Sequence, residues 1–218
     1  AVVNVRVEKK DDGEENVAEG PQMDPDMQRF FERFFGQPMP QQRGPMEHHP
    51  VRGEGSGFIV DANGTIVTNA HVAGGADKIE VIMQDGTKYD AKLKGVDEKT
   101  DIAVIKIEPK SPMPFVTFGD SSKVRVGDRV VAVGNPFGLG GTVTSGIVSA
   151  TGREIGSGPY DDFLQIDAPI NRGNSGGPAF NLDGEVIGIN SAIFSPSGGS
   201  VGIGFAIPSN LAKQVVAD

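Results

Sequence analysis

Short runs of β-branched and aliphatic residues recur along the chain, separated by polar segments rich in glycine and proline. Such runs, bounded by turn signals such as Asn63-Gly64 and Asp85-Gly86, predict β-strands rather than helices. The expected strands of the N-terminal half cover residues 1–7, 56–60, 65–69, 78–83, 88–96 and 102–107. Those of the C-terminal half cover residues 129–134, 142–152, 163–167, 178–181, 185–194 and 201–207.

Six strands in each half are enough to close a barrel. We therefore predict an all-β fold of two six-stranded antiparallel β-barrels in one domain of 218 residues. The first barrel is expected in residues 1–108 and the second in 120–208, with a short terminal helix in 209–218. Residues 108–120, which hold Pro109, Pro112 and Pro114, are interpreted as the connection between the barrels.

Composition narrows the class of protein further. The 31 glycines and 15 prolines suit a turn-rich β protein, and the absence of cysteine excludes disulfides and thiol chemistry. A net charge of −9 argues against a nucleic-acid partner, whose binding surface would be basic. No apolar run is long enough for an integral membrane segment. Residues 1–7 are interpreted as a strand rather than a signal peptide, as expected of a mature or trimmed chain.

An insertion at residues 20–52 interrupts the first barrel. Asp24-Pro25 marks a helix start and Gly36 its end, while residues 37–52 are rich in proline. Four phenylalanines fall on one face of this helix: Phe30, Phe31, Phe34 and Phe35. They either pack on their own barrel or insert into another subunit or a target, as exposed apolar clusters do.

A polar, glycine-rich segment at residues 171–177 precedes one of the expected strands and holds Ser175. Gly173, Gly176 and Gly177 can adopt positive φ at little cost, so backbone N–H groups can converge beside the Ser175 hydroxyl. One such loop can supply both a nucleophile and an oxyanion hole. Taken alone, the segment is also typical of a polar turn.

A serine nucleophile needs a base within hydrogen-bond reach. Of the three histidines, His48 and His49 fall in a proline- and glutamine-rich stretch and are interpreted as solvated loop residues. His71 follows the expected strand at 65–69, and a strand end is a suitable position for a catalytic base. His71 is therefore the candidate base.

The base in turn needs a group that orients it. Asp101 directly precedes the expected strand at 102–107, so its side chain can be fixed at the strand edge, and Asp97 is the nearest competitor. The order His71, Asp101, Ser175 is the order of chymotrypsin-type triads and differs from those of subtilisin and the α/β-hydrolases.

Three segments resemble the motif blocks of the HtrA (Deg) family of trypsin-like-fold serine proteases. They are Thr68-Asn69-Ala70-His71-Val72, Asp101-Ile102-Ala103-Val104 and Arg172-Gly173-Asn174-Ser175-Gly176-Gly177-Pro178. Further blocks match at residues 55–60, 134–138, 142–149 and 202–208, in the order of the family. The resemblance covers most of the chain from about residue 55 onward.

The resemblance implies barrels of the chymotrypsin/trypsin type with the active site in the cleft between them. It places the oxyanion donors on the N–H groups of Ser175 and Gly173. Residues Ile189, Asn190 and Ser191 are expected to form the wall of the primary pocket, where their backbone pairs with substrate. Ile170 is expected at the pocket floor, and because it carries no charge we predict cleavage after small aliphatic residues such as Val or Ala.

The resemblance also implies an ATP-independent serine endopeptidase that degrades unfolded or damaged proteins in a bacterial periplasm, with no cofactor and no metal. The family's protease domains form homotrimers through their N-terminal segments, so a homotrimer is expected. The Phe-rich insertion corresponds to the family's regulatory loop, and assembly of trimers into larger cages through it is a further alternative. The family normally carries PDZ domains after the protease, whereas this sequence ends at Asp218. An excised domain and a natural short form both account for that.

Other functions stay open at this point. The Phe-rich insertion and an open cleft would suit a chaperone that holds extended chains, either beside or instead of proteolysis. A catalytically silent scaffold is disfavoured by a complete set of triad residues, and a metal enzyme by the lack of ligand spacing among His and carboxylate residues. The glycine-rich loops around 137–141, 156–160 and 195–199 are either surface turns or an activation region that orders on binding.

Overall fold

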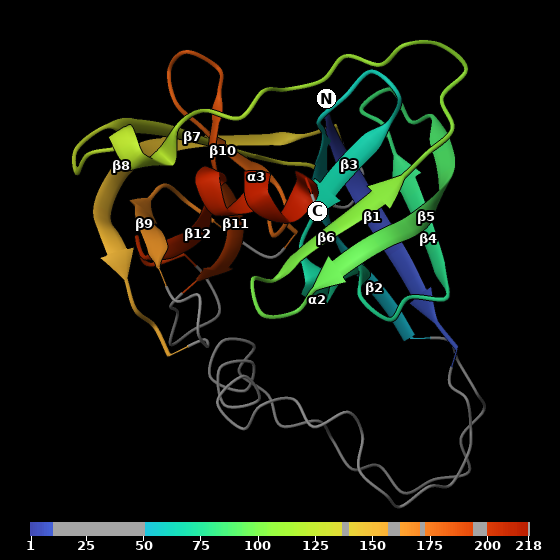
Figure 1. Ribbon diagram of the computed structural model, residues 1–218, viewed down its shortest axis with the longest axis horizontal. Helices are drawn as coiled ribbons and strands as arrows, with labels where there is room; N and C mark the ends of the chain where they lie inside the picture. The colour runs from blue at the N-terminus through green and yellow to red at the C-terminus, as the bar shows by residue number, and fades with distance from the viewer. Residues whose placement is uncertain (11–50, 137–139, 157–161, 171–172, 194–199, 218) are drawn as a thin grey trace, which may run out of the picture.

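The computed structural model describes residues 1–10, 51–136, 140–156, 162–170, 173–193 and 200–217. Two closed antiparallel β-barrels lie side by side, with α3 packed near their junction (Figure 1), which confirms the predicted fold class. The first barrel has the strand order β1-β2-β3-β6-β5-β4, and the second has the order β10-β11-β12-β9-β8-β7. Among the described helices, none has the length and apolar character that crossing a membrane requires.

The elements have the following bounds. The first barrel contains β1 (Val2–Lys9), β2 (Val51–Ile59), β3 (Thr65–Thr68), the one-turn helix α2 (Ala70–Ala73), β4 (Lys78–Ile82), β5 (Lys88–Asp97) and β6 (Ile102–Lys106). The connection contains the short 3-10 helix η1 (Ser121–Lys123). The second barrel contains β7 (Arg129–Gly134), β8 (Thr142–Arg153), β9 (Phe163–Asp167), β10 (Pro178–Phe180), β11 (Val186–Ile193) and β12 (Gly204–Pro208), followed by α3 (Ser209–Ala217).

Each barrel has its own apolar interior, because alternate residues of a strand point to opposite faces. In β1, Val3, Val5 and Val7 are buried in the core of the first barrel. The second barrel encloses a separate cluster that includes Val130, Val148, Ile166, Ile170 and Ile187. Burial of apolar surface in these two interiors stabilises each barrel on its own.

A third apolar cluster joins the barrels. Phe58, Val67 and Ile102 of the first barrel contact residues of the second barrel and α3, including Phe163, Val186, Ile189, Phe205, Ile207 and Ala212. The Phe58 ring meets the ring of Phe118, from the connecting segment, edge to face at 5.8 Å between centroids. We call this interface between the barrels the seam. Because side chains from both barrels pack into one cluster there, the two barrels are fixed relative to each other.

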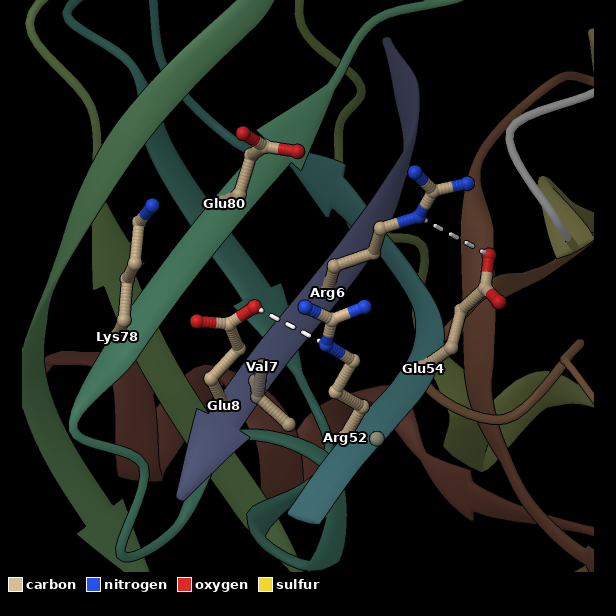
Figure 2. Close-up of a pocket in the computed structure, with 8 residues that line it drawn as sticks. Arg6, Val7, Glu8, Arg52, Glu54, Lys78 and Glu80 are labelled. Carbon is tan, nitrogen blue, oxygen red and sulfur yellow. Dashed lines mark ion pairs between the residues drawn. The ribbon is translucent and has the colours of Figure 1, made fainter. Parts of the chain in front are cut away.

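Opposite charges align on the outer face of β1, β2 and β4. Arg6 pairs in register with Glu54 and Glu80, and Glu8 pairs in register with Arg52 and Lys78. Figure 2 shows these side chains around a hollow, with ion pairs of 3.7 Å between Arg6 Nε and Glu54 Oε1 and 3.2 Å between Arg52 Nε and Glu8 Oε1. Cross-strand pairs of opposite sign favour one register over its neighbours. Its three acidic and three basic side chains balance one another, and no serine, cysteine or histidine lines it, so we do not consider this hollow a catalytic site.

Several elements differ from the sequence prediction. The strand expected at 56–60 begins at Val51, because the whole length of β1 pairs with it, and residues 51–52 therefore belong to β2. The strand expected at 201–207 begins only at Gly204. His71 was expected at a strand end and lies instead on α2. Residues 20–50 of the predicted insertion, with the four phenylalanines and His48 and His49, lie outside the described residues.

Candidate active site

His71 lies on the single turn of α2, directly after β3. Two hydrogen bonds hold the start of this turn against the residue before β6: the Ala70 N–H and the Asn69 side-chain amide both donate to the Asp101 carbonyl, at 3.1 and 3.0 Å. The helix is too short to be stable alone, so these bonds and the burial of Ala70, Val72 and Ala73 hold it in place.

Asp101 contacts the His71 ring directly. His71 Nδ1 lies 2.8 Å from Asp101 Oδ2 and 3.0 Å from Oδ1, and the His71 backbone N–H donates to Oδ1 at 2.9 Å. An ionised carboxylate only accepts, so Nδ1 carries a proton and Nε2 of the neutral ring presents its lone pair. The side chains of His71 and Asp101 are 15% and 21% exposed, which shields the pair from most of the solvent.

Asp101 adopts a backbone conformation with φ of 57°, and no other non-glycine residue in the described ranges has positive φ. This conformation is sparsely populated for side-chain-bearing residues and costs about 1–3 kcal/mol, although Asp tolerates it better than most. Asp97 behaves differently, because its carboxylate accepts from the Lys99 N–H at 3.0 Å and caps a turn. The structure brings Asp101, and not Asp97, to the imidazole.

Ser175 lies in the serine loop, residues 173–177, which directly precedes β10. Gly173 and Gly176, with φ of 96° and 85°, supply the left-handed conformations that this loop needs. The loop is tied to β11 by two backbone bonds, from the Gly176 N–H to the Asn190 carbonyl at 2.7 Å and from the Asn190 N–H to the Gly177 carbonyl at 2.9 Å. The Ser175 hydroxyl donates to the Ser191 carbonyl over a long 3.3 Å.

His71 and Ser175 open onto the same hollow. This cavity, of about 710 Å³, is lined by His71, Val72, Gly173 and Ser175. The C-terminal end of β1 and the N-terminal end of β2 complete the lining with Val7, Lys9, Val51, Arg52, Gly53 and Glu54. A histidine oriented by a carboxylate and a serine hydroxyl on a glycine-rich loop therefore line one cavity that can admit a ligand, and both residue types take part in nucleophilic catalysis.

Residues 55–189 match the family model described as the trypsin-like peptidase domain. The chain belongs to this family. Similar relatives include the probable periplasmic serine endoprotease DegP-like of Brucella suis, which is 57% identical over 99% of this chain and 46% of its own length. The protein with the same description from Rhizobium meliloti is 53% identical over 99% of this chain and 47% of its own length.

Solved structures lead to the same branch of the trypsin-like peptidases. An HtrA-type protease, AlgW, with a tripeptide superimposes with a TM-score of 0.77 at 43% identity, over 100% of this chain and 59% of AlgW. These matches confirm the resemblance to the HtrA and Deg proteases on which the sequence analysis relied. The chain spans about half the length of the curated relatives it matches.

The four predicted pocket residues of this trypsin-like domain lie close to the serine loop, but their side chains are buried. Ile170 is 3% exposed and belongs to the apolar interior of the second barrel, and Ile189 and Asn190 are fully buried in β11. The backbone of Asn190 already pairs with the serine loop. Of the predicted wall, the Ser191 carbonyl is the group that reaches the Ser175 hydroxyl.

Two hydroxyl groups beside the predicted catalytic residues could not be predicted from the sequence. Ser191 Oγ donates to Asp101 Oδ2 at 2.7 Å, so a residue predicted only to line the pocket with its backbone also contacts the carboxylate. Ser56 Oγ donates to the Gly173 carbonyl at 2.6 Å. Both bonds link residues about a hundred positions apart, so no local sequence pattern predicts them.

Among the described residues, no three His, Asp or Glu side chains lie close enough together to hold a metal ion.

Proposed function

We propose that the protein is a serine endopeptidase in which Ser175 is the nucleophile, His71 the general base and Asp101 the group that orients His71. The observation that carries the proposal is the 2.8 Å contact between His71 Nδ1 and Asp101 Oδ2 at the wall of the cavity that also exposes Ser175. A ring held in this way by Nδ1 turns Nε2 away from Asp101, where it serves as the acceptor of the serine proton.

The reaction proceeds in two acyl transfers. Ser175 Oγ attacks the carbonyl carbon of the scissile amide while its proton passes to His71 Nε2, and the carbonyl oxygen becomes an oxyanion. His71 then gives that proton to the leaving amine as the C–N bond breaks, which leaves an ester on Ser175. Water attacks this ester with His71 again as base, releasing the acid and restoring the serine.

The oxyanion is held by the N–H groups of Ser175 and Gly173. In support, the Ser175 N–H has no hydrogen-bond partner among the described residues, while the N–H groups of Gly176 and Gly177 are both used within the protein. One donor of this kind contributes about 3–4 kcal/mol to the transition state.

The residue on the acyl side of the scissile bond is a small aliphatic one. The Ser191 carbonyl accepts from the substrate backbone, with Ile189 and Asn190 behind it and Ile170 beneath the pocket. A basic side chain would find no carboxylate at Ile170, and burying an unpaired charge is costly. In a panel of peptides that differ only at this position, Val and Ala should be cleaved fastest; faster cleavage after Arg would refute the pocket assignment.

The biological role proposed is ATP-independent degradation of unfolded or damaged polypeptides in the bacterial periplasm. Support comes from the relatives, whose names describe periplasmic serine endoproteases. A homotrimer follows from the same family resemblance, and larger cages stay a prediction, as does a holding activity toward extended chains. The Phe30 to Phe35 cluster that would serve the last two lies outside the described residues.

Casein degradation compared between the unaltered protein and Ser175→Ala tests the proposal. We expect the variant to keep its fold, measured by circular dichroism, and to lose cleavage. Suppression of casein aggregation by the inactive variant would add a holding role. Cleavage by Ser175→Ala at the rate of the unaltered protein would remove the proposed nucleophile.

A further inference from the structure

Ser56, on β2 of the first barrel, is fully buried against the serine loop of the second barrel. Its hydroxyl donates to the Gly173 carbonyl at 2.6 Å, and its backbone N–H donates to the Ser175 carbonyl at 2.8 Å. One residue thus binds the carbonyls of both residues whose N–H groups are proposed to hold the oxyanion.

The two bonds fix peptide planes on either side of a proposed donor. The Gly173 carbonyl belongs to the 173–174 peptide and the Ser175 carbonyl to the 175–176 peptide. Between them lies the 174–175 peptide, which carries the Ser175 N–H, and its own carbonyl accepts from the Gly177 N–H at 3.0 Å. Because peptide units are planar, holding these three carbonyls fixes the direction of the Ser175 N–H.

The Ser56 hydroxyl is itself held in place. It accepts from the Asn135 N–H at 2.8 Å, so its proton is directed to the Gly173 carbonyl. The Ser56 carbonyl accepts from Thr68 Oγ1 at 2.7 Å, which fixes the backbone at this position. Contact on the loop side is tight, since a Cβ at Gly176 would lie 2.2 Å from the Ser56 carbonyl oxygen. Ser56 therefore has one orientation and the loop has little room to move away from it.

We propose that Ser56 is a positioning residue for the oxyanion hole, acting through its hydroxyl bond to the Gly173 carbonyl, and this role rests on the proposed endopeptidase function. Its effect belongs to the transition state, because the groups that it aligns meet a charge that exists only there. Loss of the hydroxyl should lower kcat and leave KM nearly unchanged.

Ser209→Ala provides a matched control. Ser209 is also fully buried and its Oγ also donates to a glycine carbonyl, that of Gly119, at 2.9 Å. Ser209 lies at the start of α3, away from the serine loop. Both alanine variants lose a buried hydroxyl that donates to a glycine carbonyl, and Ser56→Ala also removes the acceptor of the Asn135 N–H. Activities are therefore compared under conditions in which urea denaturation shows both variants to be folded, so that a loss confined to Ser56→Ala is not a loss of folded protein. Ser56→Thr keeps the donor and should retain most of the activity.

The experiment measures kcat and KM on a peptide with Val before the scissile bond, and titrates the trifluoromethyl ketone adduct of the same peptide by ¹⁹F NMR. The adduct forms only on folded, active protein, and its oxyanion reports the hole directly. In Ser56→Ala we expect kcat to fall about 10- to 100-fold, because a displacement of reacting groups by about 1 Å lowers the rate by up to about 100-fold. The pKa of the adduct oxyanion should rise by about one to two units, because a misaligned donor stabilises the charge less.

The outcomes separate the two claims. If Ser175→Ala is inactive while Ser56→Ala matches Ser209→Ala in both kcat and adduct pKa, the positioning role is overturned and the proposed function stands. If Ser175→Ala retains cleavage, the proposed function is overturned and the role of Ser56 with it.

Discussion

The hydroxyl of Ser191 donates to the carboxylate of Asp101 at 2.7 Å, across the seam between the two barrels. Asp101 therefore accepts from His71 within its own barrel and from Ser191 of the other. The carbonyl of the same Ser191 lies 3.3 Å from Ser175 Oγ. One residue of β11 thus contacts both the proposed orienting group and the proposed nucleophile, so correct docking of the barrels and assembly of the site are linked.

Ser191→Ala removes the hydroxyl donor to Asp101 and leaves the Ser191 backbone carbonyl in place. We expect kcat/KM to fall about tenfold, because a hydrogen bond to a charged group contributes about 1.5–3 kcal/mol. Ser122→Ala is the control, since Ser122 Oγ also donates to an aspartate, Asp120, at 2.6 Å but far from the cleft. Equal activity in the two variants would show that the Ser191 hydroxyl does not support Asp101.

Asp101→Asn keeps the shape of the side chain but allows an N–H donor to face Nδ1. The imidazole would then hold its proton on the wrong nitrogen, and in trypsin-type enzymes this change lowers kcat by about 10⁴-fold. Asp97→Asn, at the competing carboxylate, should leave kcat close to that of the unaltered protein, because Asp97 only caps a turn. Steady-state kinetics on one peptide decides between them, and a larger loss in Asp97→Asn would reverse the assignment.

Gly176→Ala and Gly184→Ala test the packing of the serine loop. Both glycines have positive φ, 85° and 79°, and both substitutions carry the cost of that conformation, about 1–2 kcal/mol. A Cβ added at Gly176 would also lie 2.2 Å from the Ser56 carbonyl oxygen and 2.5 Å from Thr68 Oγ1. A Cβ added at Gly184 would have no such neighbour within 4 Å. Gly176→Ala should abolish activity and lower the unfolding midpoint clearly more than Gly184→Ala, as measured by urea denaturation.

Asp120, in the segment between the barrels, accepts a hydrogen bond from Asn210 of α3 at 2.8 Å. We expect this contact to make the free energy of unfolding fall in acid. Hydrogen bonds from the Ser122 hydroxyl, the Asn210 amide and the Ser122 N–H lower the pKa of Asp120 well below its ordinary value of 3.8. A depressed native pKa means that the stabilisation is fully present above the unfolded pKa and is lost as pH falls through the native one. The difference in unfolding free energy between the unaltered protein and Asp120→Asn should therefore be larger at about pH 7 than at about pH 2.

The control for this prediction is Asp183→Asn. Asp183 is exposed, and its carboxylate accepts no hydrogen bond from the described residues. Its substitution should change the unfolding free energy little at either pH. An effect of Asp120→Asn that does not diminish in acid would mean that its hydrogen bonds do not stabilise the native state through the ionised carboxylate.

The sequence predicted the barrels well because strand formation is largely a local property. Alternating or continuous apolar runs bounded by glycine and proline mark most strands without knowledge of their partners. The first half of β2 lacks such a run, since Gly53-Glu54-Gly55 has no apolar face, and it becomes a strand only by pairing with β1. The helix α2 is one turn long and is held by bonds to Asp101, so no helical periodicity could indicate it.

Chain order and loop chemistry nominated His71, Asp101 and Ser175 as candidates, and the structure places His71 against Asp101 and on one cavity with Ser175. The hydrogen bonds that orient these residues could not be predicted from the sequence. Ser191 and Asp101 are 90 positions apart, and Ser56 and Gly173 are 117 apart. Only the docked barrels bring these hydroxyl groups to the carboxylate and the loop.

The most direct test of the central claim is labelling with a fluorophosphonate, which reacts with a serine hydroxyl only when a base activates it. Mass spectrometry of the digested adduct should find one modification, on Ser175, and labelling should be lost in both Ser175→Ala and His71→Ala. An unlabelled protein that still cleaves casein, or a label on another residue that survives in Ser175→Ala, would contradict the account.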